Sequence, residues 1–540
     1  MTGINLKFAY NPNMNRFVFT TLILLAATVL VTVAYFKNLK QPGQETTFVI
    51  SDIPNSAPLV LEIGNDGGFY DILSNNKLFL NVAGQQKINE LNNLRRKLLL
   101  NPSLKSYFAD QPVFISLHPN GSNAFDLLIS VASNKKIEKE AFDQLKTDSV
   151  TLKPIDINKK QGFELDIKGT DRPFYLINTE DDIYQGSFSL PLINGCAQID
   201  TRRHKPSFIQ LSNQQNNDAL AVLYVNNINL QPLLAQCFKD SKPDLFRPFC
   251  LLQAESALSM NYKTDALMFS GVTKLNENAS ESYLNLFANQ HPVVNTIENI
   301  LPSTTAYSTT FSISDPAKFT SDLADFQKKA GLTAEIRKTF EQIRTETGIN
   351  LKSEFNPLLG SEFCVITTRF QEKLGIVEVK DGSSLRPFMV NISTMSTDDI
   401  GQFNYSKIPY YLLGDVFSVF RKPYFTIINN YLVLANSASE LRSYQDSYNN
   451  QKFLSKTETF NTLDELQAEK ENVSFFIHFK NAQPVFKQTM KPAFYQAFEK
   501  NNPGLKNYYG AAYQLISSDH NFYTNYCMRL NKVDTIRNNN

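Results

Sequence analysis

Residues 104–108 read LKSYF and residues 351–355 read LKSEF, two nearly identical pentapeptides separated by 247 positions. Five further pairs of segments match in the same order and at nearly the same separation, with small insertions between them. These pairs are 53–63 with 301–313, 112–117 with 362–367, 172–178 with 422–428, 221–232 with 474–484, and 256–276 with 513–531. A repeated order at a fixed spacing is typical of a duplicated unit. The sequence therefore predicts a tandem duplication of a unit of about 250 residues.

Within each copy, strand-like apolar runs alternate with helix-like stretches. Residues 112–132 (PVFISLHPNGSNAFDLLISVA) read as two strands around a Pro-Asn-Gly turn, and residues 85–100 carry apolar side chains at helical spacing. Strands joined by hairpins, with helices between them, indicate mostly antiparallel sheets with helices over one face. The predicted fold class is α+β, with one sheet unit at 47–280 and a second at 297–532.

The N-terminal part contains an apolar segment, residues 17–36 (FVFTTLILLAATVLVTVAYF), which has no charged side chain and lies between Arg16 and Lys37. At ~1.5 Å per residue, a helix of this length spans the ~30 Å hydrocarbon core of a bilayer. A cleaved signal peptide is the alternative, but its apolar region is usually only about 7–15 residues long. The sequence predicts a cytoplasmic tail (1–16), one transmembrane helix, and a linker (37–46). This arrangement places the bulk of the chain in the periplasm, anchored in the inner (cytoplasmic) membrane of a bacterium.

Composition and motifs exclude several classes of function. The 53 basic and 52 acidic side chains nearly cancel, so no overall field favours binding to nucleic acid. The sequence contains no G-x-S-x-G, H-E-x-x-H or C-x-x-C motif and no phosphate-binding loop. No catalytic, cofactor-binding or metal-binding residue is therefore predicted, and the chain is expected not to be an enzyme.

Two small groups of residues are candidate sites. Cys237 and Cys250 flank a polar, proline-containing segment and have no counterparts in the second copy. A disulfide requires Cα atoms within about 7 Å of each other, which a chain that turns back over so short a segment can provide. An oxidising compartment permits the bridge, and two separate thiols are the alternative. Arg202, Arg203 and Lys205 form a candidate contact for an anion or a partner, with a solvated loop as the alternative.

Residues 484–500 (PVFKQTMKPAFYQAFEK) carry an apolar stripe on a helix-like stretch. The stripe consists of Val485, Phe486, Phe494, Tyr495 and Phe498. Such a stripe covers a sheet more often than it meets a partner, so it is expected to pack on the core.

The chain resembles one known family. The resemblance lies in the N-terminal apolar segment, the Ile-Pro or Leu-Pro that opens each copy, and the phrase NNYLVLANSASELRSY (429–444) followed by SFFIHF (474–479). These features are similar to those of a bacterial envelope family, the domain of unknown function numbered three-three-five-two. The resemblance covers most of the chain after residue 46. It implies a topology and a location in the envelope, but no activity and no functional residues, because the family has no established activity.

Three classes of function stay open at this point. The first is a membrane-anchored, extracytoplasmic, non-enzymatic binding or scaffold protein, whose partner is another envelope protein. The second is a carrier of a lipid or another hydrophobic ligand, in which a curved sheet and covering helices enclose a cavity lined by phenylalanine and tyrosine. The third is an enzyme whose site is assembled from distant residues without a recognisable motif. The absence of motifs and the broad surface of two copies favour the first class, and the oligomeric state is not indicated.

Overall fold

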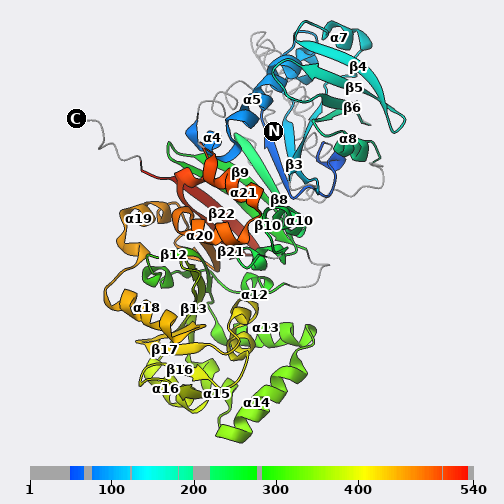
Figure 1. The fold of residues 1–540 in the computed structure, drawn as a ribbon. Coiled ribbons are helices and arrows are strands. Elements are labelled where there is room, and N and C mark those ends of the chain that lie inside the picture. Colours follow the sequence, from blue (N-terminus) through cyan, green and yellow to red (C-terminus); the bar gives the residue numbers. More distant parts are fainter. Residues whose placement is uncertain are drawn as a thin grey trace, which may run out of the picture.

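The computed structural model describes residues 49–65, 76–121, 124–179, 182–198, 219–241, 243–276, 282–501 and 503–532. Within this part of the chain, twenty strands join in one sheet, and every pairing between neighbouring strands is antiparallel. Figure 1 shows an elongated molecule in which the first half of the chain lies at one end and the second half at the other.

The first half of the chain supplies ten strands. They are β1 (Leu59–Ile63), β2 (Val113–Pro119), β3 (Phe125–Ala132), β4 (Val150–Ile157), β5 (Lys160–Ile167), β6 (Phe174–Asn178), β7 (Ile183–Ser187), β8 (Ala221–Asn226), β9 (Ala254–Tyr262) and β10 (Ala266–Leu275). Their order in space is β4-β5-β6-β7-β3-β2-β1-β8-β9-β10. The first strand of the chain therefore lies inside the sheet rather than at its edge.

The second half also supplies ten strands to this sheet. They are β12 (Thr305–Ser312), β13 (Leu359–Thr368), β14 (Lys373–Val379), β15 (Ser393–Met395), β16 (Gly401–Phe403), β17 (Tyr424–Ile428), β18 (Tyr431–Ala435), β20 (Val473–His478), β21 (Tyr508–Ser518) and β22 (Asn521–Leu530). Their order is β15-β16-β17-β18-β14-β13-β12-β20-β21-β22, the same sequence of pairings as in the first half. Two short strands, β11 (Val293–Val294) and β19 (Lys470–Glu471), pair separately.

The two halves meet where β10 pairs with β22, from Ala266 opposite Arg529 to Thr273 opposite Phe522. Across this junction, a chain of buried hydroxyl groups links neighbouring strands. The Oγ of Ser256 and the Oγ1 of Thr273 are 2.6 Å apart, and the same distance separates Thr273 Oγ1 from Thr524 Oγ1. The hydroxyl groups satisfy one another's hydrogen-bonding capacity inside the sheet. The strand pairing therefore continues across the junction without interruption.

The predicted fold class is wrong. The sequence predicts separate sheet units, whereas the strands of both halves form one sheet of twenty strands. The physical reason is that the last strand of each half has an unpaired edge, and these two edges pair with each other. The predicted transmembrane helix, residues 17–36, lies outside the described residues, and no helix in the described part is long and apolar enough to cross a membrane. The predicted boundaries 47–280 and 297–532 stay predictions.

Apart from α12, which precedes β12, the helices named here lie in the sequence between β1 and β9 of the first half or between β12 and β21 of the second half. In the first half they are α4 (Lys77–Ala83), α5 (Gln85–Leu94), α6 (Lys105–Phe108), α7 (Lys139–Gln144), α8 (Leu190–Ala197), α10 (Leu230–Cys237) and α11 (Arg247–Cys250). In the second half they are α12 (Asn285–Ala288), α13 (Pro316–Lys329), α14 (Thr333–Thr347), α15 (Leu351–Phe355), α16 (Gly382–Asn391), α17 (Ile408–Leu413), α18 (Ala438–Asn449), α19 (Glu458–Asp464), α20 (Phe479–Thr489) and α21 (Pro492–Lys500). The two matching pentapeptides form α6 and α15, each just before the second strand of its half.

Local signals in the sequence explain where several helices begin. Asp315 is the N-cap of α13, where its side chain accepts a hydrogen bond from the backbone N–H of Lys318, and Pro316 follows in the first turn. Ser437 caps α18 in the same way, by accepting from the N–H of Glu440. These caps satisfy donors that an uncapped helix would leave without partners.

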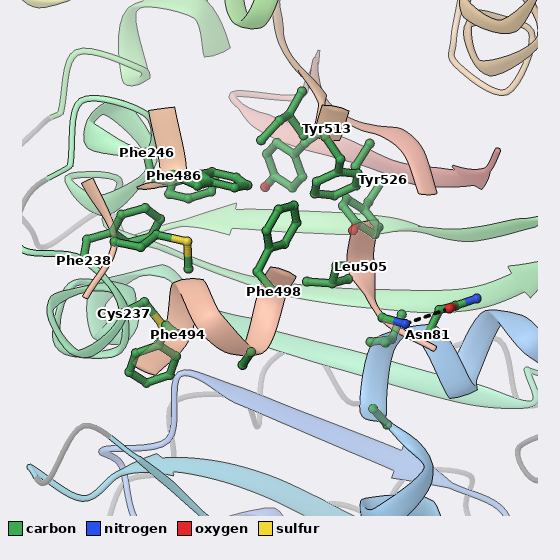
Figure 2. A pocket seen from close by; sticks show the side chains of 18 of the residues that line it. Asn81, Cys237, Phe238, Phe246, Phe486, Phe494, Phe498, Leu505, Tyr513 and Tyr526 are labelled. Atoms are coloured by element: carbon green, nitrogen blue, oxygen red, sulfur yellow. Dashed lines mark hydrogen bonds between the residues drawn. The ribbon is translucent and has the colours of Figure 1, made fainter. Parts of the chain in front are cut away.

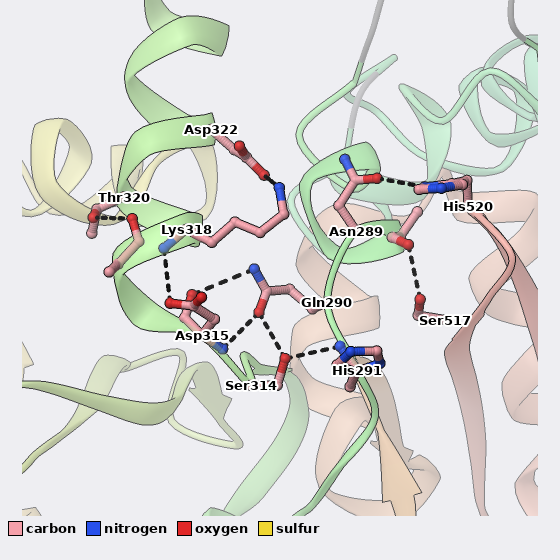
Figure 3. Close-up of polar contacts among 12 residues, drawn as sticks. Asn289, Gln290, His291, Ser314, Asp315, Lys318, Thr320, Asp322, Ser517 and His520 are labelled. Carbon is pink, nitrogen blue, oxygen red and sulfur yellow. Dashed lines mark hydrogen bonds and ion pairs between the residues drawn. The ribbon is translucent and has the colours of Figure 1, made fainter.

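The segment that connects the two halves is fixed by side-chain hydrogen bonds (Figure 3). Gln290 Oε1 accepts from the backbone N–H of Asp315 at 2.9 Å and from the hydroxyl of Ser314 at 3.1 Å, which ties the segment to the start of α13. Asn289 Oδ1 lies 3.0 Å from Nδ1 of His520, in the turn between β21 and β22. The connecting segment is therefore held to the second half at two places, the start of α13 and the turn between β21 and β22.

Candidate functional site: an apolar cavity at the junction

A cavity of about 620 Å³ lies on one face of the sheet near the junction of the two halves (Figure 2). Aromatic side chains dominate its lining, and they come from both halves of the chain. They are Phe125, Phe238, Phe246, Phe249, Phe475, Phe479, Phe486, Phe494, Phe498, Tyr513 and Tyr526. Among the described residues that line the cavity, none is charged. The space is therefore suited to an apolar occupant.

The floor of the cavity is formed by strands of the second half. Phe475 and Ile477 lie two residues apart on β20, and alternate residues of a strand point to the same face of its sheet. Tyr513 on β21 and Tyr526 on β22 continue this surface. Beside them, Ala511 is too small to fill the space above it, so the cavity extends over β21.

The roof is formed by α20 and α21, which Figure 1 shows in front of the sheet. Phe486, Met490, Phe494 and Phe498 recur every fourth residue and line the cavity. The rings of Phe486 and Phe498 meet edge to face, with centroids 5.1 Å apart. The apolar stripe expected in 484–500 is thus only partly packed on the sheet, and the rest of it encloses the cavity.

A wall from the first half closes the cavity beside the roof. The backbone of Phe238 forms a β-bridge with Met490, and the N–H of Lys239 donates to the carbonyl oxygen of Thr489 at 2.8 Å. In the other direction, the N–H of Lys491 donates to the carbonyl oxygen of Cys237 at 2.9 Å. These bonds fix the end of α10 to the short break between α20 and α21.

The predicted disulfide between Cys237 and Cys250 stays a prediction. In the structure, Cys237 has a free thiol. The backbone at Cys237 pairs with the break between the roof helices, and Cys250 is buried on α11. Cys237 lines the cavity, and burial raises the pKa of its thiol to about 11. A thiol with so high a pKa is a poor nucleophile, which gives Cys237 a packing role.

One end of the cavity is closed by α4 and the segment before β21. Asn81 Oδ1 accepts from the N–H of Gly504 at 2.9 Å and from Nδ2 of Asn507 at 2.7 Å (Figure 2). Tyr508 donates its hydroxyl proton to the carbonyl oxygen of Leu78 at 2.6 Å. Residues more than four hundred positions apart are therefore held together at this end.

Few polar groups reach the cavity, and one of them has no hydrogen-bond partner. Asn227, which precedes α10, is 2% exposed and lines the cavity. Its Nδ2 makes no hydrogen bond to any described residue. The hydroxyl of Tyr526 donates only to the weakly accepting sulfur of Met528, at 3.3 Å. A buried donor without a partner is costly unless a ligand or water satisfies it, so Asn227 is a candidate ligand contact.

A second group of unusual side chains lies away from the cavity, in the second half. Asn295 Nδ2 donates to Glu298 Oε1 at 2.8 Å and to Glu471 Oε1 at 2.5 Å, which brings the two carboxyl groups together. Burial raises the pKa of Glu471 to about 7, although hydrogen bonds from Gln514 and Asn295 lower it. Burial, and then the charge of Glu471, raise the pKa of Glu298 well above its usual value. The part of the chain that the structure describes has no group of three or more potential metal ligands.

The other predicted site is not part of this geometry. Arg202, Arg203 and Lys205 lie outside the described residues. The sequence analysis names an aromatic cavity as one possibility but does not place it, because its lining is collected from segments between residues 81 and 526. The abundance of phenylalanine, with 41 residues, and the stripe in 484–500 were the available signals.

Comparison with known proteins finds no matching family model, no matching curated protein and no matching solved structure. The resemblance to the envelope family therefore stays a prediction.

Proposed function

We propose that this protein binds an apolar ligand, such as a single acyl chain or a compact hydrophobic molecule, in the cavity between its two halves. The observation that carries the proposal is the aromatic cavity of about 620 Å³, whose described lining contains no charged residue. Sites for small organic ligands usually enclose about 300–1,000 Å³ and are lined mainly by hydrophobic side chains. Each methylene group that leaves water for such a site contributes about 0.8 kcal/mol.

The polar groups of the cavity indicate a further property of the ligand. Asn227 offers one buried amide donor that has no partner among the described residues. A ligand with one acceptor oxygen, as in an ester, an amide or an alcohol, would satisfy it. The absence of charge from the described lining argues against a carboxylate or a phosphate inside the cavity, because burying an unpaired charge is strongly unfavourable. A bound fatty acid would therefore place its acyl chain in the cavity and keep its carboxylate in solvent at the exposed rim.

This proposal selects the second of the three classes of function named above. Covalent catalysis by Cys237 would need an activated thiol, and burial instead raises the pKa of this thiol to about 11. An envelope protein partner stays a prediction, and the cavity gives it no support.

Filling the cavity should weaken binding of a fluorescent fatty acid, cis-parinaric acid. Ala497 lies on α21, lines the cavity and is exposed at its rim, so Ala497→Trp places a large side chain in the space without burying new surface in the core. We expect at least about tenfold weaker binding in a fluorescence titration, because several methylene groups of the fatty acid can no longer be buried in the cavity. The matched control is Ala493→Trp, on the same helix and exposed but not part of the lining, which should bind as the wild type does. Equal affinity of all three proteins would contradict the proposal.

Replacing Asn227 by leucine should separate the two parts of the proposed ligand. We expect Asn227→Leu to bind monoolein about 3–10-fold more weakly, because the variant lacks the amide donor for the ester or hydroxyl oxygen. Binding of 1-octadecene, which has no acceptor, should be unchanged or stronger. Both are measured by displacement of cis-parinaric acid. If the two competitors lose the same affinity, Asn227 is not the contact for the ligand oxygen.

A further inference from the structure

The segment that covers the cavity concentrates positive charge. Residues 479–507, which comprise α20, α21 and the short helix η8 (Leu505–Asn507), contain five lysines and one glutamate, a net charge of +4. The whole chain of 540 residues has a net charge of only +1. The rest of the chain therefore has a slightly negative net charge. The positive charge of this segment is local and does not follow from the overall composition.

The lysines and the phenylalanines of this segment lie on opposite sides. Phe486 and Phe498 are buried over the sheet and line the cavity, whereas Lys487 and Lys500, each next to or near one of them, are exposed. Lys506 is also exposed, and its Nζ donates to the backbone carbonyl oxygen of Glu499 at 2.6 Å. The outer surface of the roof is therefore basic and the inner surface aromatic.

Apolar side chains form the rim between these two surfaces. Val82 is 47% exposed and Leu505 is 36% exposed, and both line the cavity. Ala497, on α21, is exposed and lines it as well. The apolar lining thus continues to the molecular surface. At this rim, Leu505 lies between Lys500 and Lys506 in the sequence.

We infer that this surface, residues 479–501 and 503–507 together with Val82, docks on an anionic lipid membrane, so that the cavity faces the bilayer. The inference rests on the proposed function, because it describes where the apolar ligand would be exchanged. Exposed apolar side chains surrounded by lysines are the combination that binds at the interface of a membrane with anionic lipids. The charge decides between possible occupants: an anionic bilayer is complementary to the surface, whereas a second copy would bring two basic surfaces together.

Vesicle sedimentation with the full chain tests this surface. The wild type is compared with the triple variant Lys487→Glu, Lys500→Glu, Lys506→Glu on phosphatidylcholine vesicles with and without phosphatidylglycerol. Each lysine near an anionic surface contributes about fivefold to binding, so the triple reversal should weaken binding to the anionic vesicles at least about 100-fold. The wild type should also lose binding as salt is raised. Any contribution of residues 17–36 is common to both proteins and cancels in the comparison.

The matched control reverses three exposed lysines elsewhere, Lys136, Lys139 and Lys338, and should bind within about twofold of the wild type. If the roof variant and this control bind anionic vesicles equally, the docking surface is refuted. A wild-type dimer in light scattering that the roof variant abolishes would show a second copy as the occupant and would also refute the inference. Cis-parinaric acid binding in solution separates the two proposals: it should be intact in the roof variant, and its absence from the wild type would instead overturn the proposed function.

Discussion

Replacing Phe363 with alanine should lower the free energy of unfolding by about 3–5 kcal/mol. Phe363 lies on β13 and is fully buried, and its ring contacts four other phenylalanine rings with centroids 5.3 to 6.2 Å away. These rings belong to Phe287, Phe311, Phe319 and Phe417, which come from α12, β12, α13 and the short helix η6 (Asp415–Val419). Because five segments meet at this ring, its removal leaves a void that none of them can fill alone.

Urea denaturation followed by far-ultraviolet circular dichroism measures this effect, since the chain has no tryptophan to report by fluorescence. The control is Phe370→Ala, just after the same strand, where the side chain is 60% exposed. That variant should stay within about 0.5 kcal/mol of the wild type. A loss below about 1 kcal/mol for Phe363→Ala would show that the cluster can collapse around the change, contrary to the packing described here.

The variant Glu471→Gln should gain stability relative to the wild type as the pH rises from about 4.5 to about 7. The pKa of Glu471 is raised from 4.5 to about 7 in the folded protein. Between these values the unfolded chain releases the proton before the folded chain does, so the wild type loses stability with rising pH, by roughly 3 kcal/mol in total. Glutamine carries no charge at any pH and avoids this loss. The charge of Glu471 also raises the pKa of Glu298, so the substitution removes this second destabilising contribution as well.

The difference between variant and wild type is the quantity to measure, because other buried groups titrate in the same range. Burial lowers the pKa of His118 and of His478 from 6.5 to about 4, which makes the folded state gain stability as the pH rises through that interval. These contributions cancel when two proteins are compared at each pH. Glu469→Gln, two residues earlier and exposed, is the control and should differ from the wild type by no more than about 0.5 kcal/mol at every pH. A difference for Glu471→Gln that does not change with pH would contradict the shifted pKa.

Parts of the fold can be predicted from the sequence because they depend on short-range patterns. The matched runs 112–117 and 362–367 overlap β2 and β13, each the second strand of its half. The hairpin predicted around Pro-Asn-Gly is formed by β2 and β3. These features follow from alternation and turn residues, which act over a few positions.

The joining of the halves could not be predicted in this way. The pairing of β10 with β22 joins the exposed edge strands of the two halves, and no local sequence pattern specifies which strand pairs with an exposed edge. The position of the cavity could not be predicted for a similar reason, since the lining near Asn81 and the roof near Phe498 are brought together only in the folded chain. The backbone hydrogen bond between Cys237 and Lys491 likewise joins two distant parts of the chain, which no local pattern specifies.

The continuous ladder between β10 and β22 also decides how the cavity can exchange its contents. A hinge motion that swung the two halves apart would have to break this ladder and the buried hydroxyl chain through Thr273. The roof is attached differently, because α21 follows a break at Met490 and backbone hydrogen bonds near Phe238 hold that break to the wall. We therefore expect exchange of the proposed ligand to involve a local movement of α21 while the sheet stays intact. The rate of release should follow this local movement, and a crosslink that fixes α21 should trap the ligand without changing the arrangement of the two halves.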